Sequence, residues 1–214
     1  DRVFWGETVR RGRQTSLRLA ATPLDVSDLM REHVFTAMPA AVLTSATLAV
    51  EGRLDFTAER LGVDAPRTLV LDSPFDFTRQ AALYLPAGLP DPREEAPYDE
   101  RLAEELVGLT DLCDGGLFAL FTSHRRLRNL VGRLRADRPD RLILAQGEAA
   151  PGELLRRFRE HGRAVLCGVE TFWQGVDVPG QALRVVVLTR LPFDVPTHPV
   201  HRARATRYRN RGRD

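Results

Sequence analysis

The sequence has 214 residues and a formal net charge of +2; 43% of the residues are hydrophobic and 28% are charged. This composition is typical of a globular protein, and the length allows one large domain or one domain with part of a second. No run approaches the roughly 20 apolar residues of a membrane-spanning helix, so we expect no membrane partner and a cytoplasmic location. The chain opens Asp1-Arg2-Val3, without a methionine or a signal-peptide pattern, so we expect a piece of a longer protein.

Residue types that are missing or scattered exclude several kinds of chemistry. All 31 basic residues are arginine, so a phosphate-loop lysine or a Schiff-base lysine cannot come from this chain. Cys113 and Cys167 lie far apart and form no zinc or iron–sulfur pattern. His198 and His201 have no acidic neighbour, which favours a packing or solvated role. We therefore expect no metal site within the chain.

The first hundred residues predict a mixture of short elements. Residues 3–21 alternate around an Arg-Gly turn and predict a hairpin. Ser27 is placed to cap a helix that runs to Phe35. Short apolar runs predict strands at 40–43, 68–71 and 81–85, and the prolines of 86–97 predict an exposed loop.

Beyond residue 100, helices and strands alternate regularly. Apolar spacing predicts helices at 101–112 and 125–135 and another that begins at Pro151. Apolar runs predict strands at 117–121, 142–144, 164–167 and 184–188. Because these runs are apolar on both faces, they indicate an α/β fold with a parallel sheet covered by helices on both faces.

The predicted strands lead into polar or glycine-rich loops. In parallel sheets, ligands bind at the carboxyl ends of the strands. The loops at those ends are Thr44-Ser45-Ala46-Thr47, Thr122-Ser123-His124, Ala145-Gln146-Gly147, the segment from Gly168 to Gly180, and Thr189-Arg190.

Two interpretations are open for the residues around the predicted helix at 125–135. The hydroxyls of Thr122 and Ser123 can cap that helix, and its free N–H groups can also accept a phosphate. Arg125, Arg126 and Arg128 suit a nucleic-acid backbone or, alternatively, a solvated helix face.

The segment from Gly168 to Gly180 also allows alternatives. Phe172 and Trp173 suit either the core or a surface on which bases stack, and the core is favoured for at least one of them. Asp177 suits a ribose hydroxyl or a paired arginine. Glu170 is a weak candidate for a general base because no partner is evident.

In chain order, these segments resemble the DinG/XPD family of superfamily 2 DNA helicases. Thr44-Ser45-Ala46-Thr47-Leu48 resembles helicase motif III, and Phe121-Thr122-Ser123-His124 resembles motif IV, where DinG-type proteins often have tyrosine at the position of His124. The run from Phe172 to Gly180 resembles the motif V pattern F-W-E-G-V-D-V-P-G, with Gln174 in place of glutamate. Further matches are Ser73-Pro74-Phe75, Gln146-Gly147 and Leu191-Pro192-Phe193.

The resemblance implies two RecA-like motor domains that bind ATP with magnesium between them and move along single-stranded DNA from 5′ to 3′. Residues 1–50 would be the tail of the first domain, and residues 51–214 would be the second domain, truncated before motif VI. The partners would be single-stranded DNA and the missing N-terminal motor domain, in a bacterial, nucleoid-associated activity.

The resemblance also implies residue roles. Thr44, Ser45, Ala46 and Thr47 would couple the ATP state to strand movement, and Gln174, Gly175 and Asp177 would contact the nucleotide. The nucleic-acid-binding set would be Thr122, Ser123, His124, Arg125, Gln146, Gly147, Glu170, Thr171 and Arg190.

Several parts of the family's machinery are missing from the sequence. There is no phosphate-loop lysine, no D-E-x-H pair, no set of four cysteines for the family's iron–sulfur cluster, and no Q-x-x-G-R-x-x-R segment. We therefore expect this chain alone not to hydrolyse ATP, and we expect the arginine-rich end from Arg202 to be a helix or linker. The alternatives are a non-motor RecA-like module that binds single-stranded nucleic acid, and a small-molecule α/β enzyme.

Overall fold

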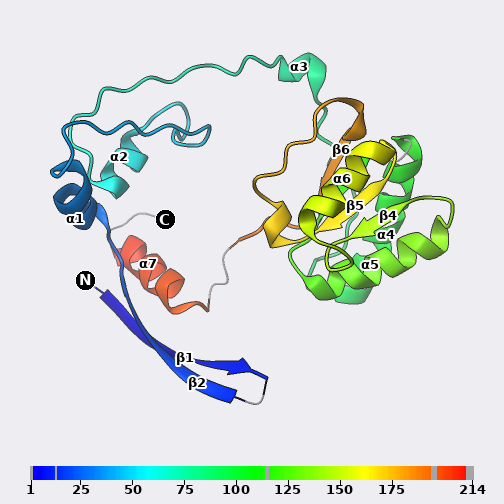
Figure 1. Ribbon diagram of the computed structural model, residues 1–214, viewed down its shortest axis with the longest axis horizontal. Coiled ribbons are helices and arrows are strands. Elements are labelled where there is room, and N and C mark those ends of the chain that lie inside the picture. Colours follow the sequence, from blue (N-terminus) through cyan, green and yellow to red (C-terminus); the bar gives the residue numbers. More distant parts are fainter. Residues whose placement is uncertain (1, 13, 114–115, 194–196, 211–214) are drawn as a thin grey trace. The chain divides into compact units, whose positions relative to one another are not determined.

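The chain divides into two compact units in a computed structural model, which describes residues 2–12, 14–113, 116–193 and 197–210 (Figure 1). The sheet unit comprises Leu83–Phe193, and the hairpin unit comprises Asp1–Ala82 with Asp194–Asp214. The motor-domain boundary predicted at residue 50 stays a prediction, since it concerns the division between two motor domains.

The sheet unit is an α/β fold around a four-stranded parallel sheet. Its strands lie in the order β4-β5-β3-β6. In register, Leu117 of β3 lies opposite Val165 of β5 and Val185 of β6. The strands are β3 (Leu117–Leu120), β4 (Ile143–Ala145), β5 (Val165–Gly168) and β6 (Val185–Leu188), and the helices are α4 (Glu95–Leu112), α5 (His124–Asp137) and α6 (Pro151–His161). The predicted parallel α/β sheet is therefore confirmed.

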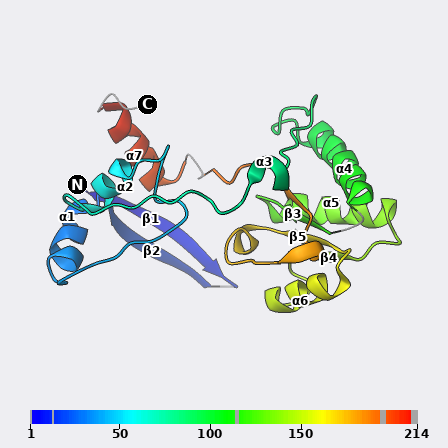
Figure 2. The same cartoon turned by 90° about the horizontal axis from the view of Figure 1, so that it is seen from above.

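Helices cover both faces of this sheet (Figure 2). On one face, α4 and α5 pack Leu106 and Leu134 against alternate strand residues such as Ala119. On the other face, α6 packs Leu154 and Phe158 against the intervening strand residues. Because successive strand side chains point to opposite faces, each strand contributes to both cores.

The edge strand β6 departs from the prediction. Its apolar run was expected to be buried on both faces, but Val186 and Leu188 are about half exposed. Among the described residues β6 has a partner strand on one side only, β3. A side chain at the edge of a sheet has fewer neighbours, so an apolar run does not ensure burial.

The hairpin unit begins with two long antiparallel strands, β1 (Arg2–Arg11) and β2 (Gln14–Pro23). Gly12 stands at the turn with φ +61°, a conformation that glycine adopts without strain. Trp5 of β1 packs edge-on against His198, with ring centroids 5.6 Å apart. The predicted hairpin is thus confirmed, and His198 has a packing contact.

Short helices complete the hairpin unit. They are α1 (Ser27–Met30), the π-helical turn η1 (Arg31–Phe35), α2 (Asp55–Leu61), α3 (Phe77–Gln80) and α7 (Pro199–Asn210). The arginine-rich end is therefore helical over the range of α7. Of the helices described in the two units, none is long and apolar enough to cross a membrane.

Three predicted strands are wrong. Residues 40–43, 68–71 and 81–85 form neither strand nor helix, and their side chains are exposed, Val42 at 91% and Leu83 at 86%. A strand forms only where a neighbouring strand pairs with its backbone N–H and C=O groups. No strand pairs with these three runs in the part of the chain that the structure describes.

Two helix starts also differ from the predictions. Ser27 does not cap α1; instead its N–H and hydroxyl groups donate to the Asp25 carboxylate at 3.0 and 2.7 Å. Helix α4 begins at Glu95, earlier than predicted, and takes in the end of the proline-rich stretch. Pro97 is compatible with this start because the first turn of a helix does not need its N–H.

Candidate binding edge of the parallel sheet

The loops after the four parallel strands lie along the edge of the sheet where the strands end at their carboxyl termini. We call this the binding edge and define it by Thr122, Ser123, Gln146, Thr171 and Thr189. The residues come from the loops after β3, β4, β5 and β6. Four of the five predicted polar loops therefore belong to one sheet, whereas Thr44–Thr47 belongs to the hairpin unit.

Gln146 connects the loops that follow β4 and β5. Its backbone N–H donates to the Cys167 carbonyl at 2.9 Å, which extends the strand pairing by one residue. Its side-chain carbonyl accepts the Val169 N–H at 2.7 Å, and its amide nitrogen donates to the Thr171 hydroxyl at 2.8 Å. Gln146 thereby fixes the start of the loop after β5, and sequence spacing alone did not predict this bond.

Trp173 connects the β5 loop to the end of β3. Its indole N–H donates to the Phe121 carbonyl at 3.1 Å, and its side chain is partly buried. A ring held in this way serves primarily to position the loop. The sequence allowed two roles for Trp173, a core residue or a surface on which bases stack. The side chain matches neither role fully, because it is only partly buried and its N–H is engaged.

Phe172 is a core residue. It is 2% exposed and meets Phe118 edge-on, with ring centroids 5.9 Å apart. A Cβ atom added to Gly168 would lie 2.8 Å from the Phe172 Cβ, closer than real contacts allow. The short turn η2 (Glu170–Phe172) can fold back on β5 because residue 168 lacks a side chain.

The segment that follows alternates between buried and exposed side chains. Val176 and Val178 pack into the core beside α6, while Gln174, Gly175 and Asp177 are exposed. Arg159 of α6 donates to the backbone carbonyl of Asp177. Asp177 therefore keeps its carboxylate at the surface while its backbone is fixed to the fold, before the turn η3 (Gly180–Ala182).

The end of β6 is held from two sides. Thr189 is 3% exposed, and its N–H and hydroxyl both donate to the Leu120 carbonyl at 3.0 Å. The Tyr98 hydroxyl of α4 donates to the Thr189 carbonyl, and burial raises the pKa of Tyr98. Tyr98 has this role although it lies next to a stretch predicted to be an exposed loop, and no sequence pattern indicated it.

At the start of α5, capping is observed. The Ser123 hydroxyl accepts the Arg126 N–H at 3.4 Å, while Thr122 is exposed. Arg125 pairs with Glu95, and the hydrogen bond from Arg125 lowers the pKa of that carboxyl. Arg126, 7% exposed, pairs with Asp99 and lies over the Tyr98 ring.

These ion pairs give two of the three arginines that follow His124 a structural role. Arg125 and Arg126 join α5 to α4, since both engage α4 carboxylates. Arg128 is exposed. This run of arginines is thus largely structural rather than a free cationic surface.

The other predicted site residues are dispersed. His124 and Arg190 are exposed at the ends of the loops after β3 and β6, and Gly147 has φ +99° directly after Gln146. The side chain of Glu170 lies outside the described residues. In the hairpin unit, Thr44 to Thr47 are exposed, and the Ser45 and Thr47 hydroxyls lie 3.2 Å apart.

Among the described residues, the exposed segment at Gly175 leaves room for a ligand, and no metal site is complete. Gly175 has φ +71°, and nothing lies within 4 Å of an added Cβ, so its backbone is open to a ligand. The described residues contain no group of three or more His, Cys, Asp or Glu side chains placed to hold a metal ion. Cys113 and Cys167 are buried free thiols, and burial raises the pKa of Cys167 to about 12.

The fold and the binding edge define a RecA-like α/β domain, and comparison with known proteins gives its family. Residues 106–214 match the family described as Helicase C-terminal domain. The chain therefore belongs to this family, as the C-terminal part of a DinG-like helicase.

Curated relatives agree with this assignment. The chain is 36% identical over 211 residues to the ATP-dependent DNA helicase YoaA of Escherichia coli, with 99% of the chain and 32% of that protein covered. It is 34% identical over 229 residues to the 3'-5' exonuclease DinG of Bacillus subtilis, covering 100% of the chain and 24% of that protein. It is 33% identical over 213 residues to the ATP-dependent helicase DinG of Mycobacterium tuberculosis H37Ra, with coverages of 98% and 32%. The chain spans about a third or less of the length of these relatives.

Proposed function

We propose that this chain is the C-terminal motor part of an ATP-dependent DNA helicase, in which the binding edge holds single-stranded DNA. The observation that carries the proposal is the Gln146 bridge, which joins the loops after β4 and β5 at the edge where ligands bind in such sheets. In this proposal Thr44–Thr47 and Asp177 have the coupling and nucleotide roles that the family resemblance implies.

The binding edge offers groups that suit a phosphodiester backbone. Thr122 has an exposed hydroxyl, and the first N–H groups of the 14-residue helix α5 have no partner within the helix. Such a terminus favours anions. Because two nearby arginines are paired with α4, we expect neutral hydrogen-bond donors rather than free cations to make most contacts along this edge.

The exposed segment from Gln174 to Asp177 would form one wall of an ATP site. The amide of Gln174, the backbone of Gly175 and the carboxylate of Asp177 would meet the nucleotide, and magnesium, when bound with ATP, would neutralise phosphate charge there. The other wall would come from the part of the first motor domain that lies outside this chain. Translocation from 5′ to 3′ is part of the same proposal.

The binding edge is tested by replacing Gln146. The variant Gln146→Ala loses both side-chain bonds that fix residues 169–171, so we expect several-fold weaker binding of a fluorescent single-stranded oligonucleotide in an anisotropy titration. Gln80→Ala is the matched control, because Gln80 is exposed on α3 of the hairpin unit. Equal affinities for the two variants would remove Gln146 from the strand-binding surface.

The nucleotide wall is tested in a protein that also contains the first motor domain. There, Asp177→Ala should lower DNA-stimulated ATP hydrolysis while sparing strand binding at low salt. Unchanged hydrolysis would place Asp177 outside the nucleotide site. Strand binding without any DNA-stimulated hydrolysis in the unmodified protein would instead support the non-motor binding module.

A further inference from the structure

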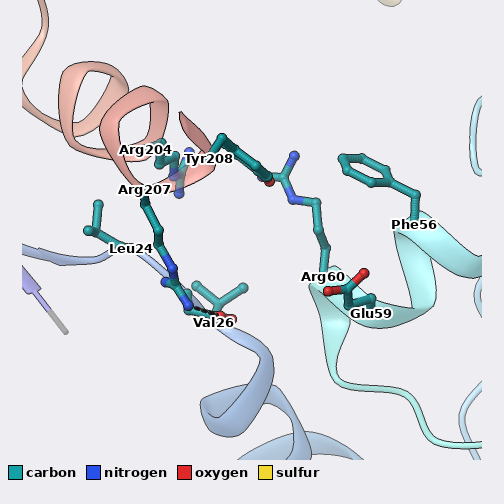
Figure 3. A pocket seen from close by; sticks show the side chains of 9 residues that line it. Leu24, Val26, Phe56, Glu59, Arg60, Arg204, Arg207 and Tyr208 are labelled. Carbon is teal, nitrogen blue, oxygen red and sulfur yellow. Dashed lines mark hydrogen bonds and ion pairs between the residues drawn. The ribbon is translucent and has the colours of Figure 1, made fainter. Parts of the chain in front are cut away.

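A small pocket in the hairpin unit collects three arginines and two aromatic rings. Its volume is about 70 Å³, several times the roughly 10–15 Å³ that a cavity needs to hold one water molecule. It is therefore large enough for a compact polyatomic group. The lining residues come from α2, α7 and the segment after β2: Leu24, Asp25, Val26, Phe56, Glu59, Arg60, Arg204, Arg207 and Tyr208 (Figure 3).

Two arginine–aromatic pairs form opposite walls of the pocket. On α2, the Arg60 guanidinium lies over the Phe56 ring, 5.6 Å from its centroid. On α7, Arg204 and Tyr208 are also four residues apart, a spacing that places both on one helix face. Figure 3 shows Arg60 and Tyr208 directed toward one another across the pocket.

Arg207 and Asp25 hold the pocket together. Arg207 donates to the Asp25 carboxylate at 2.7 Å, and that carboxylate also accepts from the N–H and hydroxyl of Ser27. This arrangement ties α7 to the segment after β2. The three arginines face two carboxylates, Asp25 and Glu59, which leaves one net positive charge in the lining.

Arg204 supplies an unused donor. Its Nε is buried and has no hydrogen-bond partner in the part of the chain that the structure describes. A buried donor without a partner is unfavourable, and guanidinium groups match phosphate oxygens in both charge and geometry. Arg204 lines the pocket, so a phosphate bound there would meet its guanidinium group.

We propose that this pocket binds one nucleotide unit, with its phosphate on Arg204 and Arg60 and its base on the exposed faces of Tyr208 and Phe56. Tyr208 and Phe56 are 36% and 44% exposed, which leaves ring surface for stacking. The nucleotide unit comes either from a free nucleotide or from a single strand. The proposal shares no residue with the binding edge, so either can fail without the other.

The test is a calorimetric titration of the 214-residue chain with inorganic phosphate, thymidine 5′-monophosphate and a short oligothymidylate. We expect Arg204→Gln to weaken binding of the monophosphate or the oligonucleotide by at least about tenfold, since it removes a charged donor. Arg202→Gln is the matched control, because Arg202 is an exposed residue of α7 outside the pocket lining. A loss of affinity confined to the oligonucleotide assigns the single strand as the source, and comparable losses for both ligands assign any nucleotide.

Two further variants keep the proposal falsifiable if Arg204→Gln disturbs folding. Arg60 lies on α2, and Arg60→Gln should weaken binding of the same ligands. Tyr208→Leu should weaken nucleotide binding several-fold and leave the binding of inorganic phosphate unchanged. Equal binding by Arg60→Gln, Arg204→Gln and Arg202→Gln would overturn the proposal. So would inorganic phosphate binding as tightly as the monophosphate, because the rings would then contribute nothing.

Discussion

Gly168 ends β5 at a position where a side chain has no room. The added methyl group of Gly168→Ala would collide with Phe172, which is itself buried against Phe118. We expect this variant to be less stable by about 1–3 kcal/mol in urea unfolding. Gly132→Ala is the control: Gly132 is exposed inside α5 with nothing near an added Cβ, so alanine should stabilise the chain by up to about 1 kcal/mol. Equal effects would show that Phe172 moves aside easily.

Asp25 is a residue whose charge should make the docking of α7 depend on pH. Hydrogen bonds from Ser27, together with Arg207, lower the pKa of Asp25 from 3.8 to about 2. When the pKa is lower in the folded state, the stability that the ionised carboxylate provides is fully present above the pKa of the unfolded state. That stability is lost as the pH falls through the pKa of the folded state. We therefore expect α7 to be fully docked at about pH 4 and to dock less tightly as the pH approaches 2.

The variant Asp25→Asn tests this dependence. It should lack the acid transition and show weaker docking near neutral pH, both measured from the NMR chemical shifts of the α7 amides. Asp28→Asn is the control, since the Asp28 carboxylate pairs with Arg31 and its side chain is 94% exposed. Because the Asp25 side chain is 40% exposed, the effect should be modest. An unchanged transition in Asp25→Asn would assign it to another group.

Helices α4 and α5 are joined by two ion pairs that differ in burial. Arg126 and Asp99 form the more buried pair, with side chains 8% and 24% exposed. Replacing Asp99 with asparagine would leave a buried guanidinium without its counter-ion, so we expect a loss of about 2 kcal/mol in unfolding free energy. Glu95→Gln breaks the exposed Arg125 pair and should change stability little. Equal small losses would show that Arg126 is satisfied by the Tyr98 ring alone.

The strands of the sheet unit were predictable because their apolar sequences agree with the burial that the sheet gives them. Strands β3, β4 and β5 are apolar throughout and become buried on both faces, and the polar loops after them meet at one edge. Equally apolar runs at 40–43 and 68–71 remain exposed and unpaired. An apolar run shows that burial is favourable, but the partner strand that makes burial possible is not encoded in the run itself.

The binding edge was predictable in its position but not in its bonds. The rule for parallel sheets identified the loops of Thr122, Gln146 and Thr171. It did not show that Gln146 holds Thr171, or that Arg125 and Arg126 are paired with α4. Those contacts depend on side chains far apart in sequence, and periodicity carries no information about them.

The two units differ in how much apolar surface they bury. Every buried apolar side chain that the structure describes lies between Tyr98 and Val178, except Val200 of α7. The hairpin unit instead exposes Phe4, Leu17 and Leu19 of its two strands, at 69–78%. Burial of apolar surface is the main source of stability, so the units should open with different free energies.

Amide hydrogen exchange on the native chain measures this difference. We expect the greatest protection in β3, β5 and α5, whose amides should exchange only when the sheet unit unfolds. The amides of β1 and β2 should exchange faster by at least about two orders of magnitude, which corresponds to a difference of roughly 3 kcal/mol in opening free energy. Added denaturant should shift the exchange of the two units separately. Equal protection in β1 and β3 would mean that the hairpin is stabilised by burial beyond its own unit.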